Sequence, residues 1–185
     1  DSEFIRTDRP IDISLSLHDH EDPVLAWYCD PIKLEPVMTD RFVGDVNQGG
    51  SVNFRNLFMN PHAHGTHTEC VGHISKEFYS INQYLKEFHF FGTLISVNTT
   101  EVENESDKMM DQIVTKKDLE IAIDGLENEI HQSQALIIRT LPNGNEKLTK
   151  NYSNTNPPYL LEEAAEYLKG KGVKHLLIDL PSVDK

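Results

Sequence analysis

The first half of the chain alternates apolar and polar positions over short stretches, a pattern that predicts β-strands. The clearest stretch is 11–17, where isoleucine or leucine occupies every second position, the period of a half-buried strand. Segments 32–38 and 52–59 are weaker strand candidates, and Gly49-Gly50 predicts a turn before the second of them. We therefore expect the first half to be rich in β-structure.

The second half alternates strand-like and helix-like patterns. Segments 92–97, 135–138 and 173–178 are predicted strands, and the unbroken apolar run at 135–138 is typical of a central strand. The polar, acidic stretch 100–111 is expected to be an exposed loop. Strands that alternate with helices after a β-rich half predict an α/β fold.

Two helices are predicted between these strands. Apolar residues from Leu119 to Leu126 are spaced i, i+3, i+4 and i+7 and so share one helical face, with Thr115 as the expected N-cap. A second apolar face runs from Leu161 to Leu168, and Gly170 is expected just past its C-terminal end.

Composition and charge narrow the classes of partner and compartment. The 185 residues suffice for one domain (1–185), and 17 Lys+Arg against 30 Asp+Glu give a net charge of −13. Nucleic acids and anionic membranes attract basic surfaces, so we expect neither as a partner. No apolar run approaches the ~20 residues that span a bilayer, and the amino end lacks a signal-peptide pattern. With only Cys29 and Cys70, we expect a reducing, cytoplasmic location.

The strongest chemical signal is a cluster of histidines. Four of the nine histidines lie within residues 62–73, together with a glutamate. Neutral imidazole and carboxylate are preferred ligands of zinc and neighbouring transition metals. The spacing differs from the helical H-E-x-x-H motif of metalloproteases. The candidate metal ligands are His62, His64, His67, Glu69 and His73.

The spacing also predicts how these side chains converge. In an extended segment His67 and Glu69 project to the same face, and His73 has the same parity. Gly65 can adopt a positive φ, and a turn there would bring His62 or His64 round to the same metal.

The segment Gly65-Thr66-His67-Thr68-Glu69, followed by His73, resembles the signature His-x-Gly-Thr-His-x-Asp-x-Pro-x-His of the cyclase family. The best-known members of this family are bacterial kynurenine formamidases. The resemblance continues in order along nearly the whole chain. Further matching positions are 12–14 (Asp-Ile-Ser), Trp27, 135–140 (ALIIRT) and 178–184 (IDLPSVD).

The resemblance implies a swivelling β/β/α domain, a homodimer or larger assembly, and one or two divalent ions, commonly zinc or manganese. It implies hydrolysis of an amide or related bond in a small molecule. Carried over by position, His67 would bind the first ion, Glu69 would bridge two ions, and His73 would act as general acid/base. Trp27 would line the substrate pocket.

The sequence departs from the family pattern at several positions. The family's first histidine is replaced by Ala63, and we favour His62 over His64 as its substitute. Glu69 stands in place of aspartate, and residues 70–72 lack the family's proline. The family draws a further histidine and a glutamate from segments after the Pro-Ser-Val-Asp stretch, so we expect this sequence to lack the natural C-terminal segment.

Three functions remain open at this stage. The leading hypothesis is a metal-dependent hydrolase of a carbon–nitrogen or similarly activated bond, resembling kynurenine formamidase. The second is a non-catalytic metal- or ligand-binding protein on the same fold. The third is a globular protein whose histidines do no chemistry. Histidine and glutamate ligands suit zinc, manganese and iron alike, so the residues do not choose the metal.

Overall fold

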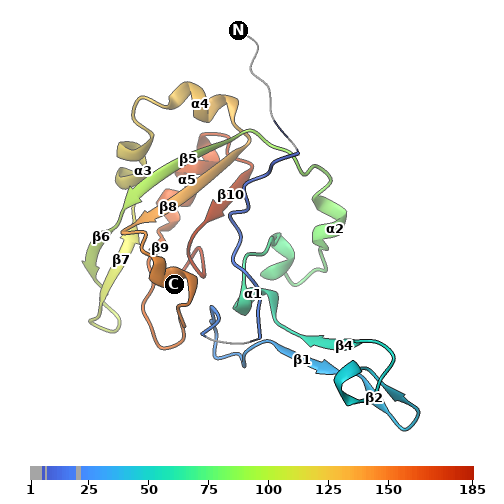
Figure 1. The fold of residues 1–185 in the computed structure, drawn as a ribbon. Coiled ribbons are helices and arrows are strands. Elements are labelled where there is room, and N and C mark those ends of the chain that lie inside the picture. The colour runs from blue at the N-terminus through green and yellow to red at the C-terminus, as the bar shows by residue number, and fades with distance from the viewer. Residues whose placement is uncertain (1–5, 7, 20–21) are drawn as a thin grey trace.

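The computed structural model describes residues 6, 8–19 and 22–185, and it shows a mixed α/β fold (Figure 1). At its centre lies a parallel sheet in which β8 separates β10 from β5. The central position of β8 confirms the prediction made from its unbroken apolar run. The strands are β5 (Gly92–Asn98), β8 (Ala135–Leu141) and β10 (His175–Ile178).

Three helices pack against one face of this sheet and enclose the main core. They are α3 (Lys116–Ile123), α4 (Glu127–Gln132) and α5 (Glu162–Gly170). Side chains from one face of β5 and β8 meet the apolar faces of all three helices. Members of this core are Ile95, Val97, Leu119, Ile123, Ile130, Leu136, Ile138, Ala164 and Leu168.

Both predicted helices are present, and their ends have clear local causes. Thr115 caps α3 as predicted: its side chain accepts the backbone N–H of Asp118, whose carboxylate accepts the backbone N–H of Thr115. The apolar spacing predicted a helix as far as Leu126, but α3 ends at Ile123. Gly125 then adopts a φ of 78°, and Leu126 is the N-cap of α4. Gly170 is the last residue of α5 rather than the residue beyond it.

The opposite face of the parallel sheet is partly open. Leu94, Ile137 and Leu177 lie in register across the three strands on that face. Leu94 is 52% exposed and Leu177 is 40% exposed. Parallel sheets usually have both faces covered. Within the described part of the chain, this sheet is therefore well covered by helices on one face only.

A second sheet corrects the expectation that 100–111 is an exposed loop: both ends of this stretch are strands, and only residues 104–109 form the loop between them. β6 (Thr100–Glu103) pairs antiparallel with β7 (Met110–Val114), and β7 pairs parallel with β9 (Tyr159–Leu160). The pairing is supported by polar contacts, such as the Gln112 amide donating to the Glu101 carboxylate at 2.9 Å. The apolar pattern missed β6 because its residues are mostly polar.

Asp111 on β7 is a buried carboxylate with a full set of partners. It is 2% exposed. It accepts hydrogen bonds from Asn104 (2.9 Å), Asn156 (2.8 Å), Lys185 (2.9 Å) and Tyr159 (2.7 Å). These bonds favour the ionised form and hold the pKa of Asp111 well below its usual range, with the bond from Asn104 contributing most.

This carboxylate predicts an acid-sensitive fold. The pKa of Asp111 is lower in the folded chain than its ordinary value of 3.8, so its contribution to stability is present above pH 3.8 and is lost as the pH falls further. In Asp111→Asn we expect a lower unfolding free energy at pH 7 and a shallower loss of stability as the pH falls from 7 to well below 3.8. Urea unfolding across this range, beside an Asp124→Asn control at an exposed position, measures both. Parallel pH curves for Asp111→Asn and wild type would contradict the assignment.

The predicted strands at 32–38 and 52–59 form a projecting ribbon. β1 (Lys33–Pro36) pairs antiparallel with β4 (Arg55–Phe58), so both predictions are confirmed. Figure 1 shows this ribbon extending away from the parallel sheet. At its far end lie β2 (Met38–Thr39), β3 (Phe42–Val43) and the 3-10 turn η1 (Val46–Gln48), closed by Gly49 with φ 92.

The strand predicted at 11–17 is wrong. These residues belong to no sheet in the structure, and Ile11 and Ile13 are 88% and 71% exposed. Instead the Leu15 N–H donates to the hydroxyl of Thr66 at 3.0 Å, which lays the segment beside the histidine cluster. The remaining elements are short: α1 (Pro61–His64), η2 (Val71–His73), α2 (Ile81–Tyr84) and η3 (Asn145–Leu148). None of the helices among the described residues is long and apolar enough to cross a membrane.

Candidate metal site

Helix α1 is a single turn that carries the first histidine of the site. Asn60 caps it by accepting the backbone N–H of His62 at 3.0 Å, and Pro61 occupies the first turn, where no N–H is required. The helix ends at His64, and the next residue, Gly65, has an extended φ of 179°. The predicted positive φ at Gly65 is therefore wrong, and the chain reversal before the Gly-Thr-His segment is made by α1.

Three imidazoles face one carboxylate oxygen. Oε2 of Glu69 lies 3.2 Å from Nδ1 of His62, 3.4 Å from Nδ1 of His73 and 3.9 Å from Nε2 of His67. The side chain of His67 is 25% exposed, and the other three are 40–49% exposed. The residues come from α1, from the extended segment after it and from η2. Glu69 is thus the centre of a solvent-accessible cluster.

The imidazole rings also contact one another. The rings of His62 and His73 are stacked, with centroids 4.5 Å apart and an interplanar angle of 28°. The rings of His62 and His67 meet edge to face at 4.8 Å. Protonating several of these rings at once would bring like charges together, whereas neutral rings present lone pairs to a shared cation.

The cluster fits the requirements of a divalent metal. His62, His67 and Glu69 each offer one ligand atom, and these atoms lie within 4.8 Å of one another. An ion holds such ligands at about 2.0–2.2 Å, so two ligand atoms on one ion lie at most ~4.4 Å apart. A small inward shift of exposed side chains therefore closes the set onto one ion.

A backbone contact prepares His67 for this role. Its Nδ1 lies 2.9 Å from the carbonyl oxygen of Gly65. A carbonyl can only accept, so Nδ1 carries the proton and Nε2, which faces Glu69, keeps its lone pair. Metal-bound histidines usually donate their second ring nitrogen in this way. No pattern along the chain predicts the Gly65 carbonyl as a partner of His67.

The structure does not bring His64 into the cluster. His64 is 4% exposed, and its Nδ1 accepts the backbone N–H of Asn60 at 2.8 Å. The proton is then on Nε2, which donates to the carbonyl of Asp30 at 2.8 Å. Both ring nitrogens are engaged in hydrogen bonds to backbone groups, Nδ1 to Asn60 and Nε2 to Asp30, so His64 offers no lone pair to a metal. Of the two alternatives left open by the sequence, only His62 reaches Glu69.

Trp27 lies in a segment attached to the far side of α1. Two residues that follow Trp27 make the attachment. The carbonyl of Asp30 accepts the hydrogen bond from His64, and the sulfur of Cys29 lies 3.7 Å from the side-chain amide of Asn60. The Trp27 side chain is 50% exposed, with a backbone φ of 58°. Its contact with substrate stays a prediction.

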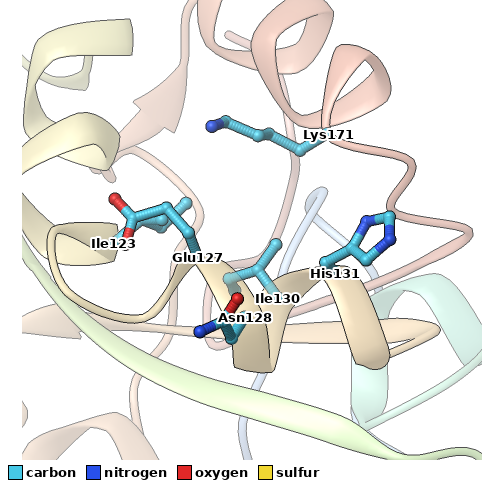
Figure 2. A pocket seen from close by; sticks show the side chains of 6 residues that line it. All are labelled: Ile123, Glu127, Asn128, Ile130, His131 and Lys171. Carbon is cyan, nitrogen blue, oxygen red and sulfur yellow. The ribbon is translucent and has the colours of Figure 1, made fainter.

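Two hollows lie outside the histidine cluster. One, of about 340 Å³, is lined by α4 and by Lys171. Figure 2 shows Lys171 on one side of it and Glu127 and His131 of α4 on the other. A second, of about 490 Å³, lies beside α1 on the side of Asn60 and His64. Because residues two apart on a helix point to different sides, this second hollow is separated from His62 by the helix itself.

The position of His73 depends on a close backbone approach at Gly72. A Cβ placed on Gly72 would overlap the carbonyl oxygen of Tyr79, whereas one on Gly65 would meet only the terminal methyl of Leu17. Leu17 is 53% exposed and free to turn aside. Gly72→Ala is therefore expected to lower the unfolding free energy by about 1–3 kcal/mol, and Gly65→Ala by clearly less. Urea unfolding of both variants measures this, and equal losses would contradict the packing described.

Comparison with known proteins identifies the family to which the chain belongs. The family model described as Putative cyclase matches residues 11–185, which include every residue of the cluster. No curated protein matches the chain. The matched range also covers Trp27 and the parallel sheet, so the likeness is not confined to the histidine motif. The chain belongs to the cyclase family.

Proposed function

We propose that this protein is a metal-dependent hydrolase that cleaves an amide or related carbon–nitrogen bond in a small molecule, in the manner of a kynurenine formamidase. The observation that carries the proposal is the convergence of His62, His67 and His73 on one oxygen of Glu69. Membership of the cyclase family supports an enzymatic role.

We assign His62, His67 and Glu69 as the residues that hold the metal, zinc or manganese, as one or two ions. A bound divalent ion supplies Lewis acidity, which lowers the pKa of water and polarises a carbonyl group. Glu69 presents Oε2 to the three imidazoles and would supply the carboxylate ligand among them. The Gly65 carbonyl fixes the ring orientation of His67 through Nδ1.

His73 is the residue that we assign to proton transfer. Its Nδ1 faces Glu69 at 3.4 Å, and its ring is held against His62 by stacking. With Nδ1 directed to the carboxylate, Nε2 is left to take a proton from the attacking water and to pass the same proton to the leaving amine. General acid catalysis of this kind requires a donor that is held in place, and the two contacts restrain the ring of His73.

Hydrolysis with and without metal tests the proposal. The purified protein is assayed on N-formylkynurenine, formanilide and a simple lactone, then stripped with a chelator and reloaded with zinc or manganese. We expect turnover of at least one amide that is lost on stripping and restored by metal. Turnover that persists in metal-free protein would contradict the mechanism. Metal binding without turnover of any substrate would favour the alternative of a non-catalytic metal-binding protein on this fold.

A further inference from the structure

Residues Ala26–Cys29 form a tight turn with an unusual pair of central residues. The turn is closed by the Cys29 N–H donating to the Ala26 carbonyl at 3.2 Å. Both central residues, Trp27 and Tyr28, have φ 58. Positive φ at both central positions is the pattern of a type I′ turn, which normally uses Asn-Gly because a bulky side chain strains this backbone. Two aromatic residues are therefore placed where the backbone disfavours them.

Burial of the aromatic rings does not explain this choice. Ala26 is 3% exposed, but Trp27 is 50% exposed and Tyr28 is 75% exposed. The rings remain largely in contact with solvent, so the hydrophobic effect offsets little of the backbone strain. The conformation must be held by other interactions, and strained turns with exposed side chains are typical of functional sites.

The loop after η3 supplies these interactions. The Tyr28 N–H donates to the hydroxyl of Ser153 at 2.9 Å, and the Tyr28 hydroxyl donates to the side-chain oxygen of Asn154 at 3.2 Å. Backbone bonds anchor Leu25 beside them, with Tyr152 N–H donating to the Leu25 carbonyl at 2.7 Å. We call Tyr28, Ser153 and Asn154 the clasp.

Residues with a strained backbone gather at the clasp and at its neighbour Trp27. Of the four non-glycine residues with positive φ among the described residues, three lie here: Trp27, Tyr28 and Asn154 (φ 61). At its other end, the same segment is tied to α1 through the carbonyl of Asp30 and the ring of His64. The turn that carries Trp27 is thus fixed both to the helix that bears His62 and to a loop more than a hundred residues away.

We infer that Ser153 and Asn154 are positioning residues, which act through Tyr28 to hold the exposed indole of Trp27 in the orientation that contacts the substrate. This inference rests on the proposed function and on the substrate contact predicted for Trp27. A group that binds substrate away from the reacting bond acts on ground state and transition state alike. Loosening the clasp therefore raises KM and leaves kcat nearly unchanged.

Intrinsic fluorescence makes the clasp directly observable, because Trp27 is the only tryptophan of the chain. Tyr28→Phe removes the hydroxyl donor. Asn154→Gly keeps the left-handed backbone but removes the acceptor, and Asn154→Asp keeps an acceptor oxygen. Tyr84→Phe, at an exposed tyrosine on α2, is the matched control. Fluorescence anisotropy, KM and kcat for formanilide, the dissociation constant from quenching of Trp27 by formanilide, and Tm are measured for each.

Tyr28→Phe and Asn154→Gly are each expected to lower the anisotropy of Trp27 and to raise KM and the dissociation constant for formanilide roughly two- to tenfold. Their double variant should show no more than the larger single effect, because both remove one hydrogen bond. Asn154→Asp and Tyr84→Phe should resemble wild type.

Unchanged anisotropy, or lower Tm with unchanged KM and dissociation constant, would reduce the clasp to a structural contact and overturn the inference. A fall in kcat at constant KM would overturn it too. If wild type shows no turnover at all, the proposed function fails, while anisotropy and formanilide quenching still decide whether the clasp positions Trp27 for a ligand.

Discussion

Replacing Glu69 by alanine is expected to release the metal and to remove metal-dependent hydrolysis. Glu69 is the common neighbour of His62, His67 and His73, and it is the only carboxylate in the His62–His67–Glu69 ligand group. Loss of groups that merely support metal ligands already costs about 10–100-fold in affinity or activity. Removing this ligand should cost more than that. Isothermal titration calorimetry, in which zinc is added to metal-free protein, measures the affinity.

Two companion variants sharpen this result. Glu69→Asp restores the carboxylate that the family signature carries, and it should keep the metal with affinity nearer to wild type. Glu77→Ala removes an exposed glutamate outside the cluster and should change nothing. A Glu69→Ala protein that binds zinc as tightly as wild type would remove Glu69 from the ligand set.

His73→Gln is expected to separate metal binding from chemistry. Glutamine keeps a polar side chain that can donate to Glu69, but it cannot exchange a proton at neutral pH. Because proton transfer by a positioned side chain contributes about 10²–10⁴-fold, kcat should fall by that factor while the metal content stays unchanged. Steady-state kinetics beside elemental analysis measure both quantities.

The other outcomes of this substitution have clear meanings. Full activity in His73→Gln would show that the proton-transfer role is wrong. Loss of metal together with activity would show that His73 is a ligand, the second role that the sequence allowed for it.

Much of the parallel sheet and its helices could be predicted from the sequence, because their patterns are long and locally supported. The apolar run of β8 and the N-cap expected at Thr115 each agree with the structure. β6 escaped prediction because its residues are mostly polar, and the neighbouring Asp111 is buried with polar partners. Hydrophobic periodicity detects burial only where the buried side chains are apolar.

The error at 11–17 has a different cause. Alternation of apolar and polar residues shows that a segment can present one apolar face, but a strand also needs a partner edge. In the structure, the Leu15 N–H donates to a side-chain hydroxyl, on Thr66, instead of a neighbouring strand. Pairing is a property of the whole fold, and the local pattern does not contain it.

The members of the histidine cluster could be predicted, but the choice between His62 and His64 could not be made from spacing alone. Asn60-Pro61 is the signal that could have decided it, since a capping residue followed by proline marks the start of a helix. One helical turn directs His62 and His64 to different sides. The clasp had no signal at all, because 125 residues separate Tyr28 from Ser153.

The central claim is that His62, His67 and Glu69 hold a metal ion, and the most direct test is elemental analysis of the purified protein. Metal per chain is measured after removal of loosely bound ions, beside His67→Ala and an exposed-histidine control, His89→Ala. We predict about one to two equivalents of zinc or manganese in wild type and in His89→Ala, and loss of this metal in His67→Ala. Wild-type protein that holds no metal, even after incubation with zinc and manganese, would contradict the account.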